Sequence, residues 1–472
     1  MPNLDQLRSQ HPRLIYRSAN YEIRDKNLYL TWHFILEPNI EFHPQVVIHN
    51  VDEKKYTYFL TPNSYFLDNL VFHLGLMEIP TYWKAACSPE IVIEAGTLNE
   101  KQISWWHDLL IQGQGEFFYL NQIDFTQPDF VKISSSGQNQ PGQLDASLSS
   151  ATTTLIPLGG GKDSIVTLEL LKKALPQQIR LFSLNPTQAV LEIVKLNADL
   201  PLITATRTID PRLLELNRQD YLNGHTPFSA YLAFLTTLIG VLFQVKDIAL
   251  SNESSANECN TIYLGQKINH QYSKTFEFEQ KFRAYAAQYL LPTTNGQSLP
   301  NYFSFLRPLH ELQIAQLFSQ IGQTYWPIFR SCNRGQATNS WCHECPKCLF
   351  AFLMLFPFVD TPTLTTKIFN HNLFDDVKLI PMALQLIKED GTKPFECVGE
   401  RDESKIAFYL AIQQYRAQHL PLPPMLAQVQ TEVLNQENDL GNRSRQLLDD
   451  WNNSHYVPAH LLTIFKSAGN KI

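Results

Sequence analysis

The chain has 472 residues, which exceeds the size of one typical domain, so we expect two or three domains. Apolar residues make up 44% of the chain and charged residues 18%, a balance typical of a folded protein rather than a disordered one. The net charge is −7 and no block of Lys or Arg interrupts it, which argues against an extended nucleic-acid-binding surface.

The compartment is predicted from what the sequence lacks. The N-terminal segment is polar, unlike a signal peptide, and the longest apolar run, Tyr231–Phe243, is too short to cross a bilayer. We therefore expect no membrane span and a cytoplasmic location. In that reducing compartment the seven cysteines are expected to bind metal or do chemistry rather than form disulfides.

Residues 1–133 are expected to form a mixed α+β domain. Residues 20–50 alternate apolar and polar positions around Asp25-Lys26-Asn27, a pattern typical of a β-hairpin. Helical patterns follow at residues 65–77 and 98–111, and strands are predicted at residues 89–96 and Gly115–Asn121.

The rest of the chain divides into three further segments. Residues 134–154 are rich in Ser, Gln and Gly and are predicted to be a linker. In residues 155–360 short apolar strands alternate with helices, the pattern of an α/β domain with a doubly wound parallel sheet. Residues 361–472 are predicted to be mostly helical.

A glycine-rich loop follows the first strand of the α/β segment and opens a helix: Gly159, Gly160, Gly161, Lys162, Asp163 and Ser164. Glycines let a backbone approach a ligand closely, and the start of a helix attracts anions. Lys162 adds a positive charge, and Asp163 could hold magnesium beside phosphates. The spacing excludes a Walker A loop and the dinucleotide fingerprint. A tight turn that only packs the strand against the helix is the alternative.

This loop resembles the SGGxDS signature of the PP-loop ATP pyrophosphatases, which cleave ATP between its α and β phosphates. Gly159 stands where that family usually has Ser. The resemblance implies that the six loop residues bind ATP, that Lys162 compensates charge in the reaction, and that Asp163 binds magnesium.

Four cysteines are spaced as metal ligands: Cys332, Cys342, Cys345 and Cys348. Four thiolates can surround one tetrahedral zinc ion, and because no position stays open for water, such a zinc would be structural. An iron–sulfur cluster is the other metal that this set could hold, and four unrelated thiols are the remaining interpretation. A similar cysteine arrangement occurs in the 7-cyano-7-deazaguanine synthases, which are also PP-loop enzymes.

Several polar stretches lie between apolar elements, and one of them follows the strand predicted at residues 247–252, at the edge where open α/β sheets bind ligands. Each stretch alone could be a turn or a helix cap. Together they favour a binding site formed by Asn223, His225, Asn252, Glu253, Asn257, His270, Gln271, Tyr272, Ser273, Lys274 and Arg307. Cys397 lies in a further polar segment, outside the zinc-like cluster.

The segments GGGKDS, NGHTP, SNESSAN, NHQYSKTFEFE, FRSCNR, WCHECPKC and KPFECVG together resemble one family, the ATP-dependent UDP-N-acetylmuramoyl-L-alanyl-L-glutamate epimerases. The resemblance extends from the first aromatic strands to about Ala407. It implies inversion of the terminal L-glutamate of UDP-MurNAc-L-Ala-L-Glu to the D form for peptidoglycan synthesis, with ATP converted to AMP and pyrophosphate.

The implied chemistry assigns roles to residues. Adenylation of a carboxylate removes its charge and makes the neighbouring α-proton more acidic, so that a positioned base can remove it. By analogy with the thiols of cofactor-free glutamate racemases, Cys397 is the candidate acid/base, and His270 is the candidate second base. The expected ligands are ATP, magnesium, structural zinc and the UDP-MurNAc-dipeptide.

Two other functions are consistent with parts of the sequence. A PP-loop enzyme that amidates or thiolates a nucleobase or tRNA could share both the loop and the cysteines, although the net acidity argues against tRNA. A zinc-stabilised nucleotide-binding module without enzymatic activity is the second alternative. The oligomeric state does not follow from the sequence.

Overall fold

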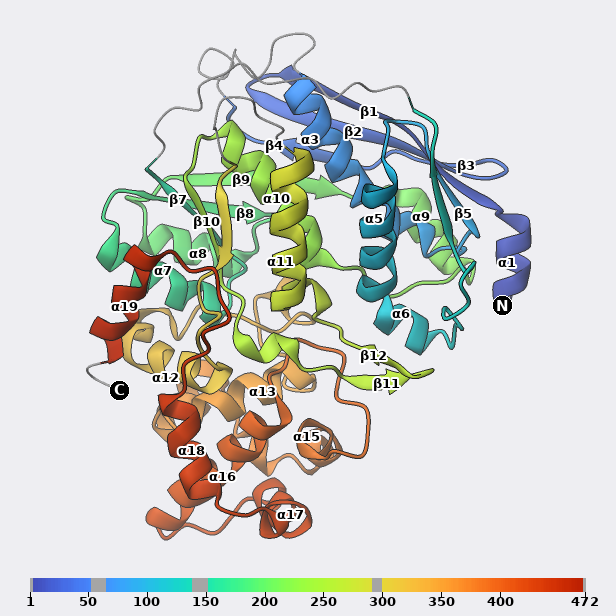
Figure 1. Ribbon diagram of the computed structural model, residues 1–472. Helices are drawn as coiled ribbons and strands as arrows, with labels where there is room; N and C mark the ends of the chain where they lie inside the picture. The colour runs from blue at the N-terminus through green and yellow to red at the C-terminus, as the bar shows by residue number, and fades with distance from the viewer. Residues whose placement is uncertain (1–2, 52–64, 138–151, 291–298, 470–472) are drawn as a thin grey trace.

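The computed structural model describes residues 3–51, 65–137, 152–290 and 299–469 (Figure 1). In these residues eleven strands form one mixed, mostly parallel sheet in the order β13-β10-β7-β8-β9-β4-β2-β1-β5-β6, with β3 beside β2. The strands are β1 (Arg13–Arg24), β2 (Asn27–Leu36), β3 (Ile40–Phe42), β4 (Gln45–Ile48), β5 (Glu90–Ile93), β6 (Lys132–Ser135), β7 (Thr154–Pro157), β8 (Ile179–Leu184), β9 (Leu202–Thr208), β10 (Asp247–Leu250) and β13 (Asn301–Ser304); a separate hairpin pairs β11 (Thr261–Tyr263) with β12 (Gln266–Ile268).

The helices cover the sheet and continue into a helical C-terminal region, at the bottom of Figure 1. They are α1 (Leu4–Gln10), α3 (Tyr65–Leu76), α4 (Ile79–Trp83), α5 (Glu100–Gly113), α6 (Gly115–Leu120), α7 (Lys162–Ala174), α8 (Gln188–Leu196), α9 (Pro211–Arg218), α10 (Phe228–Leu242), α11 (Phe276–Tyr285), α12 (Glu311–Ile321), α13 (Pro346–Leu355), α14 (Thr361–Thr363), α15 (Ile380–Ile387), α16 (Arg401–Ala417), α17 (Pro424–Glu432), α18 (Leu440–Asp449) and α19 (Ala459–Gly469). None of the described helices is long and apolar enough to span a membrane.

The five strands β13, β10, β7, β8 and β9 are parallel, and their order reverses at β7. From β7 the chain proceeds outward to β8 and β9, and then returns to the other side of β7 as β10. Ligands of open α/β sheets bind at the carboxyl ends of the strands where such a reversal occurs. The predicted α/β character is confirmed, whereas the specific PP-loop fold stays a prediction.

The N-terminal strands belong to the same sheet as the parallel strands. β4 pairs antiparallel with β9, in a register that runs from Gln45 opposite Thr208 to Ile48 opposite Ala205. The predicted turn at Asp25 and Lys26 is confirmed: both residues have positive φ between β1 and β2, as a two-residue hairpin turn requires. The sheet therefore runs without interruption from the N-terminal strands to β13.

The predicted division of the chain into 1–133, 155–360 and 361–472 stays a prediction. Most of the predicted linker, residues 138–151, lies outside the described residues, and the flanking residues end β6 and begin β7. The described part of the C-terminal region is helical, as expected.

The prediction of a strand at Gly115–Asn121 is wrong, because residues Gly115–Leu120 form helix α6. The consecutive side chains of Phe117 and Phe118 are both fully buried, which removes the alternation that a half-exposed strand would show. α6 follows α5 after the single residue Gln114, whose side chain is also buried. Tertiary packing of aromatic residues overrides their local preference for strand.

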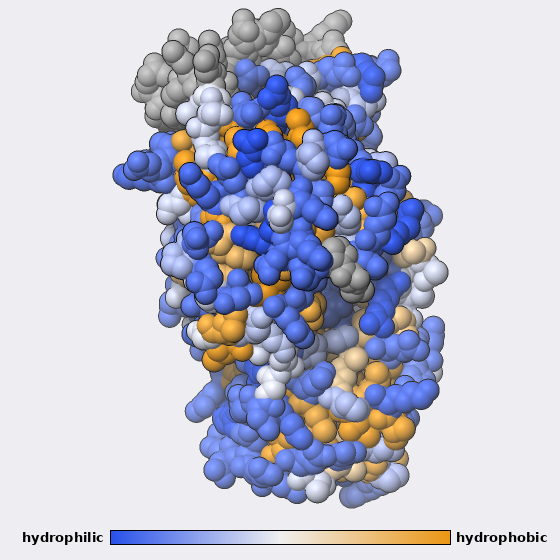
Figure 2. All heavy atoms as spheres, turned by 90° about the vertical axis from the view of Figure 1, so that its right-hand side faces the viewer, coloured by the Kyte–Doolittle hydropathy of each residue, from blue (hydrophilic) through white to orange (hydrophobic). Residues whose placement is uncertain are grey.

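The apolar run at Tyr231–Phe243 belongs to α10, which is buried on nearly all sides. α10 packs between β10 of the sheet and α3 of the N-terminal part. A helix that is apolar all round is typical of the core of a large protein. Figure 2 shows, by contrast, one outer face on which hydrophilic side chains predominate, with separate hydrophobic patches.

A buried ion pair also joins the N-terminal part to the parallel strands. Arg207 on β9 donates to Glu78, which precedes α4, through Nε at 2.8 Å and Nη2 at 2.5 Å. The Glu78 side chain is fully buried and that of Arg207 is 10% exposed. Burial alone lowers the pKa of Arg207, but the carboxylate of Glu78 raises it above its ordinary value.

We expect Glu78→Gln to lower the free energy of unfolding by about 3 kcal/mol, because it leaves the buried Arg207 charge uncompensated. Urea denaturation measures this change. The matched control is Glu215→Gln, which removes the exposed ion pair with Arg212 and should cost about 1 kcal/mol or less. Equal losses for the two variants would contradict the structural role of the buried pair.

Candidate functional site

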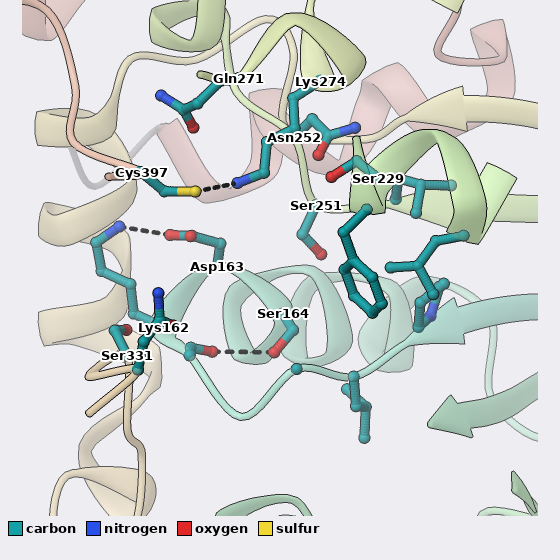
Figure 3. Close-up of a pocket in the computed structure, with 18 of the residues that line it drawn as sticks. Lys162, Asp163, Ser164, Ser229, Ser251, Asn252, Gln271, Lys274, Ser331 and Cys397 are labelled. Carbon is teal, nitrogen blue, oxygen red and sulfur yellow. Dashed lines mark hydrogen bonds and ion pairs between the residues drawn. The ribbon is translucent and has the colours of Figure 1, made fainter. Parts of the chain in front are cut away.

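A cavity of about 480 Å³ lies at the carboxyl ends of the parallel strands, where the strand order reverses (Figure 3). Residues 157–159 and 161–164 at the end of β7 and after it, residues 182–184 on β8 and residues 250–252 at the end of β10 form its sheet-side wall. The other walls come from residues 270, 271, 273 and 274, from the segment 330–351 and from Cys397. The cavity thus lies where the sheet topology predicts a ligand site.

The glycine-rich loop lines this cavity between β7 and α7. Gly160 has φ of +86°, which disfavours side chains larger than hydrogen. Gly161 is the N-cap of α7, and no side chain caps the helix, so its first N–H groups have no capping partner. A Cβ atom on Gly161 would lie 3.0 Å from Ser331 Oγ. The loop therefore presents backbone N–H groups at a helix start, the arrangement that binds phosphate.

Lys162 is held between two carboxylates beside this loop. Its Nζ lies 2.5 Å from Asp163 Oδ1 and forms a second, closer ion pair with Glu311. Burial alone lowers the pKa of Lys162, but the two carboxylates raise it above its ordinary value. Lys162 is therefore a buried permanent cation of the cavity.

Three carboxylates converge at the same place. Oxygen atoms of Asp163, Glu253 and Glu311 lie within 4.8 Å of one another. Burial, together with the nearby charge of Asp163, raises the pKa of Glu311, and burial is also the main cause that raises the pKa of Glu253. Such a group of oxygen ligands could hold a divalent cation such as Mg²⁺. Glu253, which was predicted from the sequence, thus lies beside Asp163. Glu311, at the start of α12, was not predicted from the sequence.

Cys397 lies opposite the glycine-rich loop and faces Lys274 (Figure 3). Lys274 Nζ donates to Cys397 Sγ at 3.3 Å. Burial alone raises the pKa of the Cys397 thiol, but the positive charges of Lys274 and Lys347 and the hydrogen bond with His270 lower it well below its ordinary value. The surrounding positive charges therefore favour the thiolate of Cys397, the reactive form of cysteine.

Two histidines border the same wall. His270 lies beside Cys397, and its Nδ1 is 2.5 Å from Glu116 Oε2 on α6. The ring of His225 lies 4.3 Å from that of His270, centroid to centroid. Burial and the neighbouring His270 lower the pKa of His225 to about 3, so that His225 is neutral.

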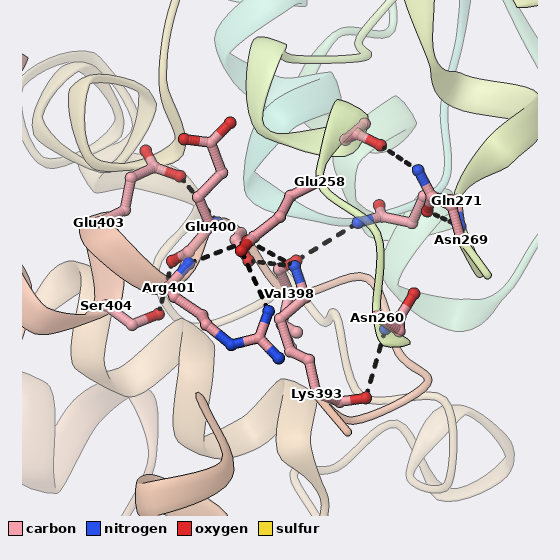
Figure 4. A network of polar contacts seen from close by, with 12 residues as sticks. Glu258, Asn260, Asn269, Gln271, Lys393, Val398, Glu400, Arg401, Glu403 and Ser404 are labelled. Carbon is pink, nitrogen blue, oxygen red and sulfur yellow. Dashed lines mark hydrogen bonds and ion pairs between the residues drawn. The ribbon is translucent and has the colours of Figure 1, made fainter. Parts of the chain in front are cut away.

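Buried polar contacts fix the loop that carries Cys397 (Figure 4). Lys393 Nζ donates to Glu258 Oε2 at 2.8 Å, and Arg401 Nη1 donates to Glu258 Oε1 at 3.1 Å. The side chain of Asn260 donates to Pro394 O at 2.7 Å, and that of Gln271 donates to Val398 O at 3.3 Å. Both ends of the loop are thereby tied to the segment that follows β10.

Most of the residues predicted from the sequence meet in this one cavity. The predicted residues on its wall are Gly159, Gly161, Lys162, Asp163, Ser164, His225, Asn252, His270, Gln271, Ser273, Lys274 and Cys397. Gly160 belongs to the same loop but not to the wall.

Five predicted substrate residues do not line the cavity, and one of them is Glu253, whose carboxylate lies beside those of Asp163 and Glu311. Asn223 accepts a hydrogen bond from Gly224 N, and Asn257 accepts one from Phe276 N at the start of α11. Tyr272 donates to Asp108 on α5. The fully buried Arg307 donates to the backbone oxygens of Glu253 and Lys274 and so ties together two segments near the cavity.

Sequence reasoning missed one side of the cavity wall. Apolar and small polar side chains from β8 and α10 form part of it: Phe182, Ser183, Leu184, Phe228, Ser229 and Leu232. The cysteine-containing segment contributes Arg330, Ser331, Asn333, Gln336 and Lys347. The FRSCNR segment was a signal for the second group, but nothing local marked the first.

The four clustered cysteines are close enough to share one metal ion. Sγ–Sγ distances are 3.8 Å from Cys332 to Cys345, 3.5 Å from Cys345 to Cys348 and 3.7 Å from Cys342 to Cys348. Thiolates about 2.3 Å from a tetrahedral zinc lie about 3.8 Å apart. All seven cysteines are free of disulfides. The cluster could therefore hold a zinc ion.

The chain matches two family models. A model described as the MurL N-terminal domain matches residues 6–305, and one described as the MurL C-terminal domain matches residues 328–440. The two ranges together include Cys397 and the four clustered cysteines. No solved structure matches the chain.

Curated relatives match most of the chain. A protein of a Micromonospora species is 36% identical over 346 residues, which cover 72% of this chain and 74% of the relative. A protein of Xanthomonas oryzae pv. oryzae is 33% identical over 351 residues, which cover 73% of this chain and 74% of the relative. Both relatives are named UDP-N-acetyl-alpha-D-muramoyl-L-alanyl-L-glutamate epimerase.

Proposed function

The chain belongs to the family of UDP-N-acetyl-alpha-D-muramoyl-L-alanyl-L-glutamate epimerases, and on this premise we propose that it inverts the terminal L-glutamate of UDP-MurNAc-L-Ala-L-Glu to the D form. The observation that supports this most directly is a buried thiolate, Cys397, in one cavity with a phosphate-binding type of loop. The product of the proposed reaction would serve peptidoglycan synthesis in the cytoplasm.

We further propose that ATP is split to AMP and pyrophosphate in the same cavity. The glycine-rich loop and Lys162 would hold the phosphates, while the apolar wall with Phe182 and Leu184 suits a nucleobase. Asp163, with Glu253 and Glu311 beside it, would hold Mg²⁺, which neutralises phosphate charge. These features are those expected of the PP-loop fold.

Adenylation explains why the epimerisation would need ATP. The substrate carboxylate oxygen attacks the α-phosphorus of ATP, and pyrophosphate leaves. The acyl-adenylate has lost the carboxylate charge, so its carbonyl can accept the electron pair left when the α-proton departs. Return of a proton on the other face inverts the carbon, and water then releases AMP and the free carboxylate.

We propose Cys397 as the group that exchanges a proton with the α-carbon. A buried thiolate is a suitable base, and Lys274, whose Nζ lies 3.3 Å from the sulfur, stabilises its charge. His270 and Cys397 line the same cavity and interact with each other, so the two groups would serve the same face of the substrate. We therefore propose His270 as the partner of Cys397, rather than as the base of the opposite face.

We propose that the four-cysteine cluster holds one structural zinc ion. Its sulfur atoms lie within 4.8 Å of one another, as expected around a single ion, whereas the ligands of an iron–sulfur cluster bind separate irons. α13 begins directly after Cys345, so the zinc would fix this helix and Lys347 at the cavity wall.

Incubation of the purified protein with ATP, Mg²⁺ and UDP-MurNAc-L-Ala-L-Glu tests the reaction. We expect pyrophosphate and AMP to form, and chiral analysis of the hydrolysed product to show D-glutamate. Pyrophosphate without inversion would reject the epimerase activity. A reaction that requires ammonia or a sulfur donor would indicate modification of a nucleobase or tRNA instead.

Cys397→Ser should abolish inversion and leave pyrophosphate formation nearly intact, because a hydroxyl is a much weaker base than a thiolate whereas adenylation does not need the thiol. Coupled pyrophosphate assay and chiral analysis measure the two steps separately. Cys259→Ser, at a cysteine outside the cavity wall, is the control. Full inversion by Cys397→Ser would remove the thiol from the mechanism.

Elemental analysis of the purified protein should find one zinc ion per chain and no iron. Cys345→Ser should lose that zinc and should unfold at a lower temperature, since a structural zinc contributes directly to folding free energy. Cys87→Ser is a matched control at a buried cysteine outside the cluster. A full zinc content in Cys345→Ser would refute the assigned site.

A further inference from the structure

Glu116 is a largely buried carboxylate that contacts His270 of the cavity wall, and the proposed reaction so far gives it no role. It lies on α6, and its side chain is only 11% exposed. Its Oε2 atom is 2.5 Å from Nδ1 of His270. The carboxylate comes from the N-terminal part of the chain, whereas His270 follows the hairpin β11–β12, so the contact joins residues 154 positions apart.

Packing fixes Glu116 in this position. Its neighbours Phe117 and Phe118 are fully buried in the core. Gly115, on its other side, lies against β12, since a Cβ atom there would be 3.3 Å from the side chain of Ile268. On the histidine side, His270 N donates to Asn260 Oδ1 at 2.8 Å. Both partners are therefore held by rigid surroundings.

The imidazole of His270 lies between Glu116 and Cys397. Burial alone lowers the pKa of His270, but hydrogen bonds with Cys397 and Glu116 raise it to about 9. A carboxylate on one ring nitrogen fixes the orientation of the ring and favours the imidazolium. The imidazolium in turn stabilises the thiolate of Cys397.

Other charged and titratable groups surround the three residues. His225 and Lys84 lie on the Glu116 side of the three residues. Burial is the main cause that lowers the pKa of His225, and the charges of His270 and Lys84 lower it further. On the thiol side lie Lys274, Lys347 and Glu396. Lys274 stabilises the thiolate independently of His270. The loss of Glu116 would therefore raise the pKa of the Cys397 thiol only in part.

We propose that Glu116 is a positioning residue that holds His270 as an imidazolium aimed at Cys397, so that the three side chains form one proton-transfer unit. The thiolate takes the α-proton: the C–H bond breaks, an S–H bond forms, and the electron pair stays on the substrate. The catalytic part of this proposal rests on the proposed function. The pairing itself is a property of the protein without substrate.

The pairing is tested by alkylation of Cys397 with iodoacetamide over a series of pH values, without ATP or substrate. Mass spectrometry of the peptide that contains Cys397 separates it from the other six cysteines. An ordinary thiol has a pKa of about 8.5. We expect the alkylation rate of Cys397 to reach half of its maximum at a pH below that value. Glu116→Gln should move the midpoint upward by roughly half a pH unit or more, because His270 loses its anionic partner.

The sign of the shift is diagnostic. If Glu116 acted on Cys397 only through its own charge, its removal would lower the pKa of the thiol and move the midpoint downward. A downward shift or no shift in Glu116→Gln would therefore overturn the proposal. Glu116→Asp keeps the charge and should retain most of the low midpoint, and Glu100→Gln, at an exposed carboxylate of α5, should leave it unchanged.

A double substitution separates positioning from a general structural effect. His270→Gln should raise the midpoint by itself, and Glu116→Gln in that background should raise it no further, because Glu116 acts through His270. An additional upward shift in the double variant would mean that Glu116 acts through the fold, and would overturn the proposal.

Kinetics then connect the unit to the reaction. Glu116→Gln should lower the rate of inversion about a hundredfold, the usual contribution of acid–base catalysis, with pyrophosphate formation nearly unchanged. An equal loss of both rates would contradict a positioning role. If the alkylation shift occurs but even the unsubstituted protein does not invert glutamate, the pairing stands and the proposed function falls.

Discussion

The pairing of β4 with β9 is the interaction on which the arrangement of the molecule depends. Through this one ladder the N-terminal strands become part of the sheet whose other half carries the glycine-rich loop. The buried pair of Arg207 with Glu78 strengthens the same junction. Across this junction α6 lies against β12, and Glu116 reaches His270. A side chain from the N-terminal part thereby contacts a residue of the cavity wall.

Buried charge dominates the cavity, and it is nearly balanced within it. The cations Lys162 and Lys274 face Asp163 and the thiolate of Cys397, while burial raises the pKa of Glu253 and Glu311 beside them and so favours their neutral forms. Removal of one partner from such a set leaves an uncompensated buried charge, which costs much more than the pair contributes. The same balance explains how a thiol in a buried position can be ionised at all, since burial alone would keep it protonated.

The cavity has two chemically different sides, and they are built differently. Around the glycine-rich loop, the binding groups are backbone N–H groups and residues adjacent in sequence, positioned by the turn from β7 into α7. Around Cys397 the groups come from four distant segments, and polar contacts of Glu258, Asn260 and Gln271 hold the loop in place. The first side suits the proposed nucleotide site, and the second suits the proposed proton-transfer site.

Features built from residues that are close together in the chain could be predicted from the sequence alone. The loop from Gly159 to Ser164, the cysteine cluster and the turn at Asp25 and Lys26 depend on residues close together in the chain, so their patterns predict them. Tertiary structure decided the rest. The aromatic residues of α6 favour a strand locally but form a helix because both Phe117 and Phe118 fit into the core. Glu311 and Glu116 carry no local signal, since they acquire a role only through the side chains that long-range packing places beside them.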